Sequence, residues 1–221
     1  KPEVTESNCF EPSTTPSCNM PEHAAIGVRN RYGTPTYRRG VLIGLTGRYA
    51  SGKSTVVAWL VSKGLSSESC SDSIRAHLKE KGIEESRENL IEGGNELRRV
   101  GGTGILAEML LERINGENAV IDSIRTPGEV KALRHREDFV LIEVRAGMEE
   151  RWQRAQSRAR TGDISDKETF FANEEVEAVA KDESGQALNA TAALADLILV
   201  NDGSLEELHS DLEELWGLLS E

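Results

Sequence analysis

Val41-Leu42-Ile43-Gly44-Leu45 is an apolar run that leads, through Thr46, into Gly47-Arg48-Tyr49-Ala50-Ser51-Gly52-Lys53-Ser54. The first segment has the composition of a buried strand. The second matches the phosphate-binding loop pattern G-x-x-x-x-G-K-S in the strand-to-helix context that this loop requires. Its glycines let the backbone wrap closely enough for successive N–H groups to point at phosphate oxygens. The stretch therefore predicts a triphosphate site at the start of a helix.

The same motif assigns roles to individual residues. Lys53 is expected to supply a positive charge to the phosphates, and Ser54 a hydroxyl to magnesium. The predicted nucleotide-binding residues are Gly47, Ala50, Ser51, Gly52, Lys53, Ser54 and Thr55. The alternative is a glycine turn before an ordinary helix, which the four fixed positions of the motif disfavour.

Composition narrows the class of protein. The 221 residues, 38% of them hydrophobic, suit one α/β domain with an appendage. A formal charge of −12, from 26 basic and 38 acidic side chains, disfavours a broad contact with nucleic acid or anionic lipid. No run approaches the roughly 20 apolar residues of a membrane span, and no secretory signal is recognisable. We therefore expect a cytoplasmic protein that binds neither nucleic acid nor membrane, with Cys9, Cys18 and Cys70 as free thiols.

The chain divides into a tail and one domain. Residues 1–36 are rich in Pro, Ser, Thr and Glu without a sustained period, which predicts an irregular or disordered tail. Because the chain starts at Lys1 rather than Met, we expect further sequence upstream. Residues 37–221 alternate helical patterns with short apolar runs, as in a parallel sheet covered on both faces. The predicted strands lie near Val41–Leu45, Glu68–Ser71, Ala119–Asp122, Phe139–Arg145 and Asp196–Val200.

Helices are predicted between and after these strands. The first covers Gly52–Lys63, and the last begins at a capping box of Ser204 and Glu207. The last helix carries an apolar stripe expected to be core: Leu205, Leu208, Leu212, Leu215, Trp216 and Leu219. Two helical segments interrupt the sheet pattern, and we interpret 73–114 as a substrate-binding insertion and 147–194 as a lid region.

Two Asp-x-x-Arg pairs follow predicted strands. Asp122 ends the strand Ala119–Asp122, where a carboxylate can hold magnesium beside the phosphate loop, and Arg125 lies three residues further on. Asp72 and Arg75 repeat the pattern after the second strand. Since ligands of such sheets bind outside the carboxyl ends of the strands, the two guanidiniums suit a second phosphate. The alternative is that Asp122 caps a turn before Pro127 and that Arg125 is a surface charge.

A cluster of arginines lies in the predicted lid. Arg151, Arg154 and Arg158 share one face of a helix at spacing i, i+3, i+7 and are expected to close onto phosphates, with Arg154 and Arg158 as catalytic residues beside Lys53 and Asp122. The alternative is a solvated face paired with Glu149 and Glu150.

These segments resemble a known family. The chain from about Arg39 is similar to P-loop nucleotide-kinase-like proteins related to CMP and AMP kinases, and its end also resembles dephospho-CoA kinase. The matching segments are Gly44–Ser54, Ser71–Arg75, Glu88–Leu90, Gly94–Arg98, Val120–Arg125, Glu129–Val130 and Ala195–Ser204. The Asp72–Arg75 segment matches adenylate kinase, whereas Asp122–Arg125 only approximates its Asp-Gly-x-Pro-Arg segment.

The resemblance implies a parallel five-stranded sheet of order 2-3-1-4-5 in a three-layer α/β/α fold, with a helical substrate-binding insertion and an arginine-bearing lid. It implies that Arg75 and Arg125 bind the acceptor phosphate and that Arg154 or Arg158 acts from the lid. With Asp72 and Arg98, Arg75 and Arg125 make up the predicted substrate-binding set.

The predicted function is transfer of the terminal phosphoryl group of ATP, with Mg²⁺ at Ser54 and Asp122, to a nucleoside monophosphate or similar acceptor. One alternative is transfer to a sugar hydroxyl, as in dephospho-CoA kinase, with Asp72 as the carboxylate near the acceptor. Another is a nucleotide-binding regulatory module without transfer activity. A GTPase switch is disfavoured because no N-K-x-D motif occurs. The acceptor, the purpose of the tail and the oligomeric state are not specified by these residues.

Overall fold

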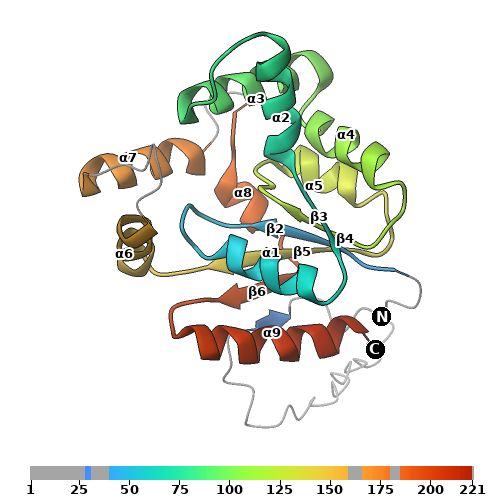
Figure 1. Cartoon of the computed structure of the whole chain (residues 1–221), viewed down its shortest axis with the longest axis vertical. Coiled ribbons are helices and arrows are strands. Elements are labelled where there is room, and N and C mark those ends of the chain that lie inside the picture. The colour runs from blue at the N-terminus through green and yellow to red at the C-terminus, as the bar shows by residue number, and fades with distance from the viewer. Residues whose placement is uncertain (1–27, 31–39, 159–165, 180–184, 221) are drawn as a thin grey trace, which may run out of the picture.

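A sheet with five parallel strands forms the centre of the molecule. The computed structural model describes residues 28–30, 40–158, 166–179 and 185–220 (Figure 1). Within these ranges the strands are β1 (Val28–Asn30), β2 (Leu42–Thr46), β3 (Ser66–Ser69), β4 (Ala119–Asp122), β5 (Phe139–Arg145) and β6 (Leu197–Val200). Their order is β1-β6-β5-β2-β4-β3. The parallel strands β2 to β6, numbered along the chain, follow the order 2-3-1-4-5, which confirms the predicted fold class.

The sixth strand was not predicted. β1 pairs antiparallel with β6, and Val28 lies opposite Leu199. It belongs to the segment that the sequence indicates to be an irregular tail. The rest of residues 1–36 lies outside the described residues, as do Cys9 and Cys18, whereas Cys70 is a buried free thiol.

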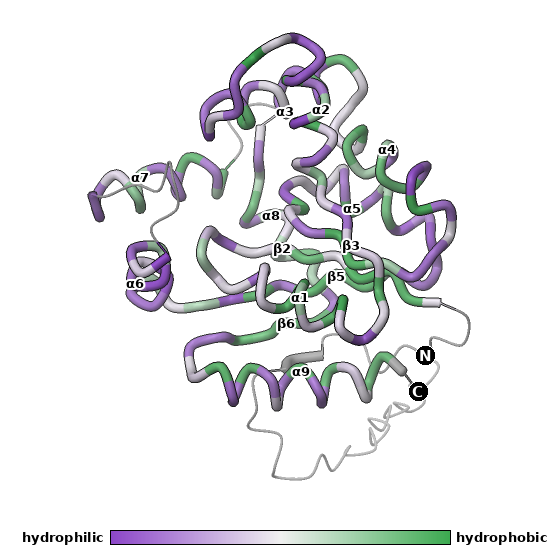
Figure 2. Tube along the Cα trace, in the orientation of Figure 1, coloured by the Kyte–Doolittle hydropathy of each residue, from purple (hydrophilic) through white to green (hydrophobic). Residues whose placement is uncertain are grey.

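Both faces of the sheet are covered by helices. Along β5, Phe139 and Leu141 pack into one apolar cluster, and Val140 and Ile142 pack into another on the opposite face. This alternation is the period of 2 expected for a strand buried on both sides. The first cluster includes α4 (Ile105–Ile114) and α5 (Pro127–Leu133), and the second includes α1 (Lys53–Ser62) and α9 (Leu205–Ser220). Figure 2 shows hydrophobic residues concentrated in the central strands β2, β5 and β6 and alternating with hydrophilic ones along α9.

The predicted first and last helices are present. The capping box of α9 is confirmed, because Ser204 N donates to Glu207 Oε2 at 2.7 Å and Glu207 N donates to Ser204 Oγ at 3.2 Å. Four leucines of the apolar stripe are buried, at positions 208, 212, 215 and 219. Leu205 is 53% exposed, so its assignment to the core is wrong.

The second predicted strand ends earlier than expected. Ser69 accepts a hydrogen bond from Ser71 N at 3.3 Å and caps α2 (Cys70–Glu80), so that the helix begins at Cys70. Asp72 and Arg75 therefore lie in the first turns of a helix rather than at the end of a strand.

The two interrupting segments are helical, as predicted. The first contains α2, α3 (Arg87–Gly101) and α4, and the second contains α6 (Met148–Arg158), α7 (Lys167–Ala178) and α8 (Leu188–Ala192). Figure 1 shows α2 and α3 beyond one end of the sheet, and α6 and α7 beside the loop that follows β2. Among the described helices, none has both the length and the apolar character to cross a lipid bilayer.

Candidate active site

The phosphate-binding loop lies between β2 and α1, and some of its residues have positive φ angles. Gly47, Ala50 and Gly52 have φ angles of 138°, 57° and 102°. A change of handedness between neighbouring residues turns successive N–H groups toward a common hollow, which is the geometry of an anion-binding nest. Ser51 lies buried within the loop, and Ser54 and Thr55 occupy the first turn of α1.

Two glycines are required where the loop contacts the rest of the fold. A Cβ at Gly47 would lie 2.2 Å from the carbonyl oxygen of Val144, at the end of β5. A Cβ at Gly52 would lie 2.1 Å from Asn201 Nδ2, which donates to the carbonyl oxygen of Ser51 at 2.9 Å. The loop is therefore held between β5 and the segment that follows β6.

The side chain of Lys53 folds back onto the first residues of the loop. Its Nζ donates to the carbonyl oxygens of Gly47 at 2.7 Å and Arg48 at 3.0 Å. Burial lowers the pKa of Lys53 to about 8, and the negative charge of Asp122 partly opposes this effect. The other charged groups that act on Lys53 are Arg125, Glu177 and Arg151. Asp122 and Arg125 are thus among the charges that influence the pKa of Lys53.

This lowered pKa predicts proton uptake when a nucleotide binds. Above about pH 8 Lys53 is partly neutral in the free protein, whereas phosphate beside its Nζ stabilises the charged form and raises its pKa. Binding should therefore take up protons at about pH 8.5, and affinity should fall as pH rises further. Calorimetry of ATP binding in buffers of different ionisation enthalpy measures this uptake. Lys53→Arg should abolish it because a guanidinium stays charged. Equal enthalpies in all buffers for the unchanged protein would contradict the assignment.

Asp122 and Ser54 have the chemistry of a magnesium site. Asp122 ends β4, and its Oδ1 accepts a hydrogen bond from Ser123 N at 2.6 Å, with Ser123 at a φ of 65°. The described residues include no group of three or more His, Cys, Asp or Glu side chains able to hold a metal. Mg²⁺ commonly takes one or two protein ligands together with substrate phosphates and water, so one carboxylate and one hydroxyl beside the loop fit it.

The turn before Pro127 does not need Asp122 as a cap. Thr126 caps α5: its Oγ1 accepts a hydrogen bond from Glu129 N at 3.2 Å, and Glu129 Oε2 accepts one from Thr126 N at 3.2 Å. The helix after the turn is thus capped by Thr126, whereas Asp122 accepts from Ser123 N at the start of the turn.

Arg125 is held by several partners. Its Nη1 donates to Glu177 Oε2 at 3.0 Å and to Gln186 Oε1 at 2.9 Å, and its backbone N donates to Glu129 Oε2 at 2.7 Å. Its side chain is only 31% exposed. Arg125 is thus not a free surface charge.

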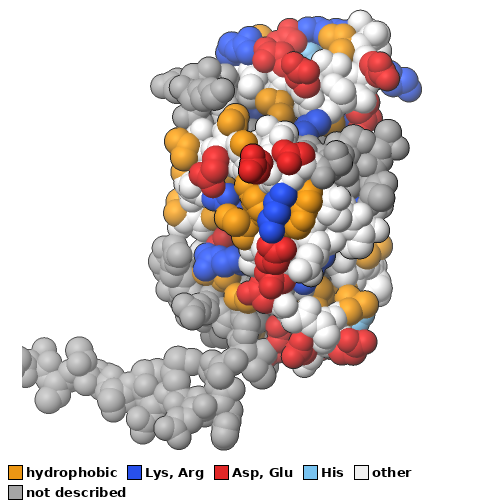
Figure 3. All heavy atoms as spheres, turned by 90° about the vertical axis from the view of Figure 1, so that its left-hand side faces the viewer, with side chains coloured by type: hydrophobic (Ala, Val, Ile, Leu, Met, Phe, Trp, Pro, Cys, Tyr) orange, Lys and Arg blue, Asp and Glu red, His pale blue; other side chains and the backbone are white. Residues whose placement is uncertain are grey.

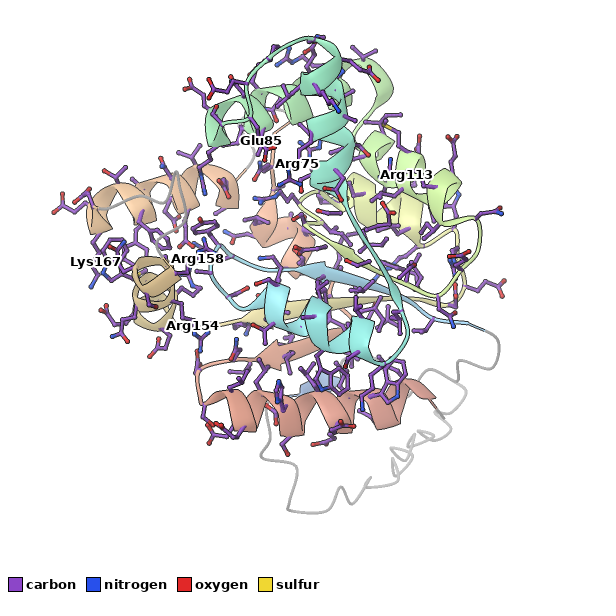
Figure 4. The ribbon with its side chains drawn as sticks, in the orientation of Figure 1. Arg75, Glu85, Arg113, Arg154, Arg158 and Lys167 are labelled. Atoms are coloured by element: carbon purple, nitrogen blue, oxygen red, sulfur yellow. The ribbon has the colours of Figure 1, made fainter. Side chains whose placement is uncertain are left out.

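Arg75 has partners of its own, one on α2 and one in the segment between α2 and α3. Its Nη1 donates to Asp72 Oδ1 at 2.8 Å and its Nε to Glu85 Oε1 at 2.9 Å, a pair that Figure 4 shows beside α2. The hydrogen bond that Arg75 donates to Glu85, together with the one it donates to Asp72, raises the pKa of Arg75 despite partial burial. Asp72 and Arg75 are both exposed, and they form an i, i+3 ion pair.

Arg98, which belongs to the predicted substrate-binding set, is buried. It is 3% exposed, and its Nη2 donates to Oε1 of the fully buried Glu129 at 2.8 Å. This pair links α3 to α5 inside the fold. This buried pairing does not support the prediction that Arg98 binds substrate.

The three arginines predicted to share one face of α6 have different partners in the structure. Arg151 is buried in an ion pair with Glu174 of α7, and Arg154 donates to the carbonyl oxygen of Asn201 at 2.8 Å. The guanidinium of Arg158 lies 4.4 Å from the centre of the Tyr49 ring. The three arginines thus have three different surroundings, and Figure 4 shows Arg154 and Arg158 apart on α6. Figure 3 shows acidic, basic and apolar side chains mixed on this side of the molecule. Ala159 and Arg160 lie outside the described residues.

Residues that the sequence did not single out contact the loop. Tyr49, within the loop, contacts Arg87 at 4.8 Å as well as Arg158, and its ring centre lies 5.7 Å from that of Phe170 on α7. Both helical segments therefore meet the loop at Tyr49. No spacing or motif marks Arg87, which is simply the first residue after the helix cap Ser86.

A hollow of about 310 Å³ borders the loop. Its lining residues are Arg48, Glu143, Val144, Arg145, Ala146, Met148, Arg151 and Glu175. The volume is at the lower end of the range for small-ligand sites.

A phosphate-binding loop after the central strand of a 2-3-1-4-5 parallel sheet defines the P-loop kinase fold. Solved structures agree: TT1252 from Thermus thermophilus superposes with a TM-score of 0.55 at 24% identity, covering 81% of this chain and 98% of that one. Shikimate kinase from Bacteroides thetaiotaomicron gives a TM-score of 0.52 at 14% identity, covering 82% of this chain and 99% of that one. At these identities the likeness concerns the fold.

The chain belongs to the UPF0200 family. A UPF0200 protein of Methanoregula boonei is 32% identical over 178 residues, which are 79% of this chain and 94% of that protein. UPF0200 protein TK1334 of Thermococcus kodakarensis is 27% identical over 183 residues, covering 79% of this chain and 96% of that protein. No protein-family model matches the chain.

Proposed function

We propose that this protein is an ATP- and magnesium-dependent phosphotransferase that moves the terminal phosphoryl group of ATP to the phosphate of a nucleoside monophosphate or a similar phosphorylated nucleotide. The observation that carries the proposal is the position of the loop: Lys53 Nζ contacts the loop carbonyl oxygens, and β2, which leads into the loop, pairs with β4, which ends at Asp122, three residues before Arg125. A phosphate-binding loop, a carboxylate and a fixed guanidinium are what two anionic reactants and a divalent cation need at one place.

Each residue has a defined task in this proposal. The loop amides and Lys53 bind the donor phosphates, while Arg125 orients the acceptor phosphate. Ser54 and Asp122 would hold Mg²⁺, which neutralises phosphate charge when bound. An acceptor phosphate oxygen forms a bond to the terminal phosphorus of ATP as the bond from that phosphorus to the bridging oxygen of ADP breaks. No general base is required, because a phosphate monoester is already an oxyanion near neutral pH.

Transfer to a sugar hydroxyl is less well supported. That chemistry requires a carboxylate near the acceptor hydroxyl, and Asp72 was the predicted residue. In the structure an oxygen of Asp72 is engaged by Arg75 at 2.8 Å, at an exposed position on α2.

Arg75→Ala tests the predicted acceptor side. Loss of a charge-assisted hydrogen bond to phosphate should weaken the binding of a nucleoside monophosphate by about tenfold or more, and the binding of ATP by much less. Calorimetric titration with each ligand measures the two losses. Lys79→Ala, which removes a positive charge from an exposed position of the same helix, is the matched control. Equal losses of affinity for both ligands in Arg75→Ala would contradict the placement of Arg75 at the acceptor phosphate.

A substrate panel tests the activity itself. The protein is incubated with Mg-ATP and, separately, ribo- and deoxyribonucleoside monophosphates and dephospho-CoA, and ADP release is measured. The proposal expects ADP release that depends on one or more monophosphates. Release with dephospho-CoA alone would support hydroxyl transfer instead. Tight ATP binding without release in any mixture would support a regulatory nucleotide-binding module.

A further inference from the structure

Helix α7 places a carboxylate between two arginines at the candidate acceptor site. Glu177 is 6% exposed, and its two oxygens have different partners. Arg87, the first residue of α3, donates to Oε1, and Arg125, between β4 and α5, donates to Oε2 at 3.0 Å. The carboxylate therefore joins two guanidiniums that are far apart in sequence.

This ion cluster lies beside the phosphate-binding loop. Arg87 also contacts the ring of Tyr49 in the loop, 4.8 Å from its centre. Phe170, 2% exposed, fixes α7 at this place because its ring lies 5.7 Å from Tyr49 and 5.4 Å from Trp152 of α6. Glu177 is thus a negative charge within the site.

The carboxylate of Glu177 does not pair with every donor of the two guanidiniums. Nε of Arg87 is buried and has no hydrogen-bond partner among the described residues, although Nη2 of the same guanidinium is engaged. A buried donor without an acceptor is costly, so this N–H indicates a missing acceptor. Two guanidiniums facing one carboxylate also leave one positive charge unmatched.

A phosphate monoester has what Glu177 lacks. Its terminal oxygens are three rather than two, and it carries close to two negative charges at neutral pH. It can accept from Nε and Nη2 of Arg87 in the bidentate manner that guanidinium favours, and from Arg125 with a third oxygen.

We propose that Arg87 and Arg125 form the subsite for the acceptor phosphate, and that Glu177 is an internal competitor which the phosphate displaces. The proposal deepens the proposed function and rests on it for the identity of the ligand as an acceptor. It adds Arg87 to the binding residues and gives α7 a role in the affinity for the acceptor.

The opposite role for Glu177 makes a different prediction. If Glu177 only positioned the two arginines for substrate, removing its charge would weaken phosphate binding. If Glu177 competes with phosphate, removing its charge while keeping its shape strengthens binding. The sign of the change therefore distinguishes the two roles.

The test uses Glu177→Gln and inorganic phosphate as the probe. Calorimetry is carried out near pH 7.5 with saturating Mg-ADP, so that the phosphate-binding loop is filled. We expect Glu177→Gln to bind phosphate at least about fivefold more tightly than the unchanged protein, and Arg87→Ala at least about tenfold more weakly. Glu168→Gln, an exposed charge removal on the same helix, is the control and should leave binding unchanged.

Unchanged or weaker phosphate binding in Glu177→Gln would overturn the competitor role. Unchanged binding in Arg87→Ala would remove Arg87 from the subsite. If circular dichroism shows that Glu177→Gln does not fold, Arg87→Lys tests the subsite instead. Lysine keeps the positive charge but lacks the guanidinium Nε, so we expect weaker phosphate binding. Unchanged phosphate binding in Arg87→Lys would overturn the subsite.

Turnover is measured separately, which keeps the two proposals distinguishable. Tighter phosphate binding in Glu177→Gln without transfer to any monophosphate would contradict the proposed function and leave the anion subsite standing. Transfer by the unchanged protein together with weaker phosphate binding in Glu177→Gln would support the proposed function and contradict the competitor role of Glu177.

Discussion

Replacement of Lys53 by alanine is expected to lower the rate of phosphoryl transfer by at least about a hundredfold, or about 3 kcal/mol of lost charge stabilisation. The ammonium group lies inside the loop, where it donates to the carbonyl oxygens of Gly47 and Arg48. As phosphoryl transfer depends mostly on positioning and on cationic stabilisation of peripheral oxygens, no neighbouring side chain can replace this charge at the same place.

The fold should survive this change. Lys53 is the first residue of α1, and alanine is a good helix former there. Turnover with Mg-ATP and the accepted monophosphate is compared with the unfolding curve of each variant. Lys63→Ala, in which the lost ion pair with Glu213 lies at the other end of α1, should retain nearly full turnover. Full turnover in well-folded Lys53→Ala would remove Lys53 from the mechanism.

Replacement of Glu129 by alanine is expected to reduce the free energy of unfolding by about 3–5 kcal/mol. Glu129 is fully buried, and its loss leaves the guanidinium of Arg98, 3% exposed, without its counter-charge. The backbone N–H groups of Arg125 and Thr126 lose their acceptor as well. Denaturant-induced unfolding at equilibrium measures the change.

A double variant separates the charge from the packing. Arg98→Met combined with Glu129→Leu replaces the pair by apolar side chains of similar size, which commonly costs little or stabilises. We expect it to recover the part of the loss that comes from the unpaired charge of Arg98, but not the part that comes from the backbone N–H groups of Arg125 and Thr126. A loss below about 1 kcal/mol in Glu129→Ala would show that Arg98 finds another partner or water, and that the pair does not link α3 to α5 as described.

Sequence patterns were sufficient for the five parallel strands and the loop because both depend on local signals. The strand-loop-helix motif around Lys53 fixes the central strand, and the apolar runs of β4 to β6 mark strands buried on both faces. The boundary between β3 and α2 was missed because the Ser69 side chain caps the helix, a local competition that serines make hard to predict. β1 has three residues, too few for a period.

The arginines show why a site is harder to predict than a fold. Arg98 and Arg151 have sequence positions that suit phosphate contacts, yet each is buried against a glutamate 31 or 23 residues away. Arg87 and Glu177 are 90 residues apart, and no local pattern relates them. Which arginines remain available to a phosphate is decided by where the acidic residues of α5 and α7 pack.

The fate of the terminal phosphoryl group of ATP tests the central claim most directly. ATP labelled at its terminal phosphorus is incubated with Mg²⁺, the protein and each nucleoside monophosphate, and the label is located by phosphorus NMR or by separation of the products. Our account predicts label in the β-phosphoryl group of a nucleoside diphosphate. Label that stays in ATP, or appears only in inorganic phosphate with every monophosphate, would contradict it.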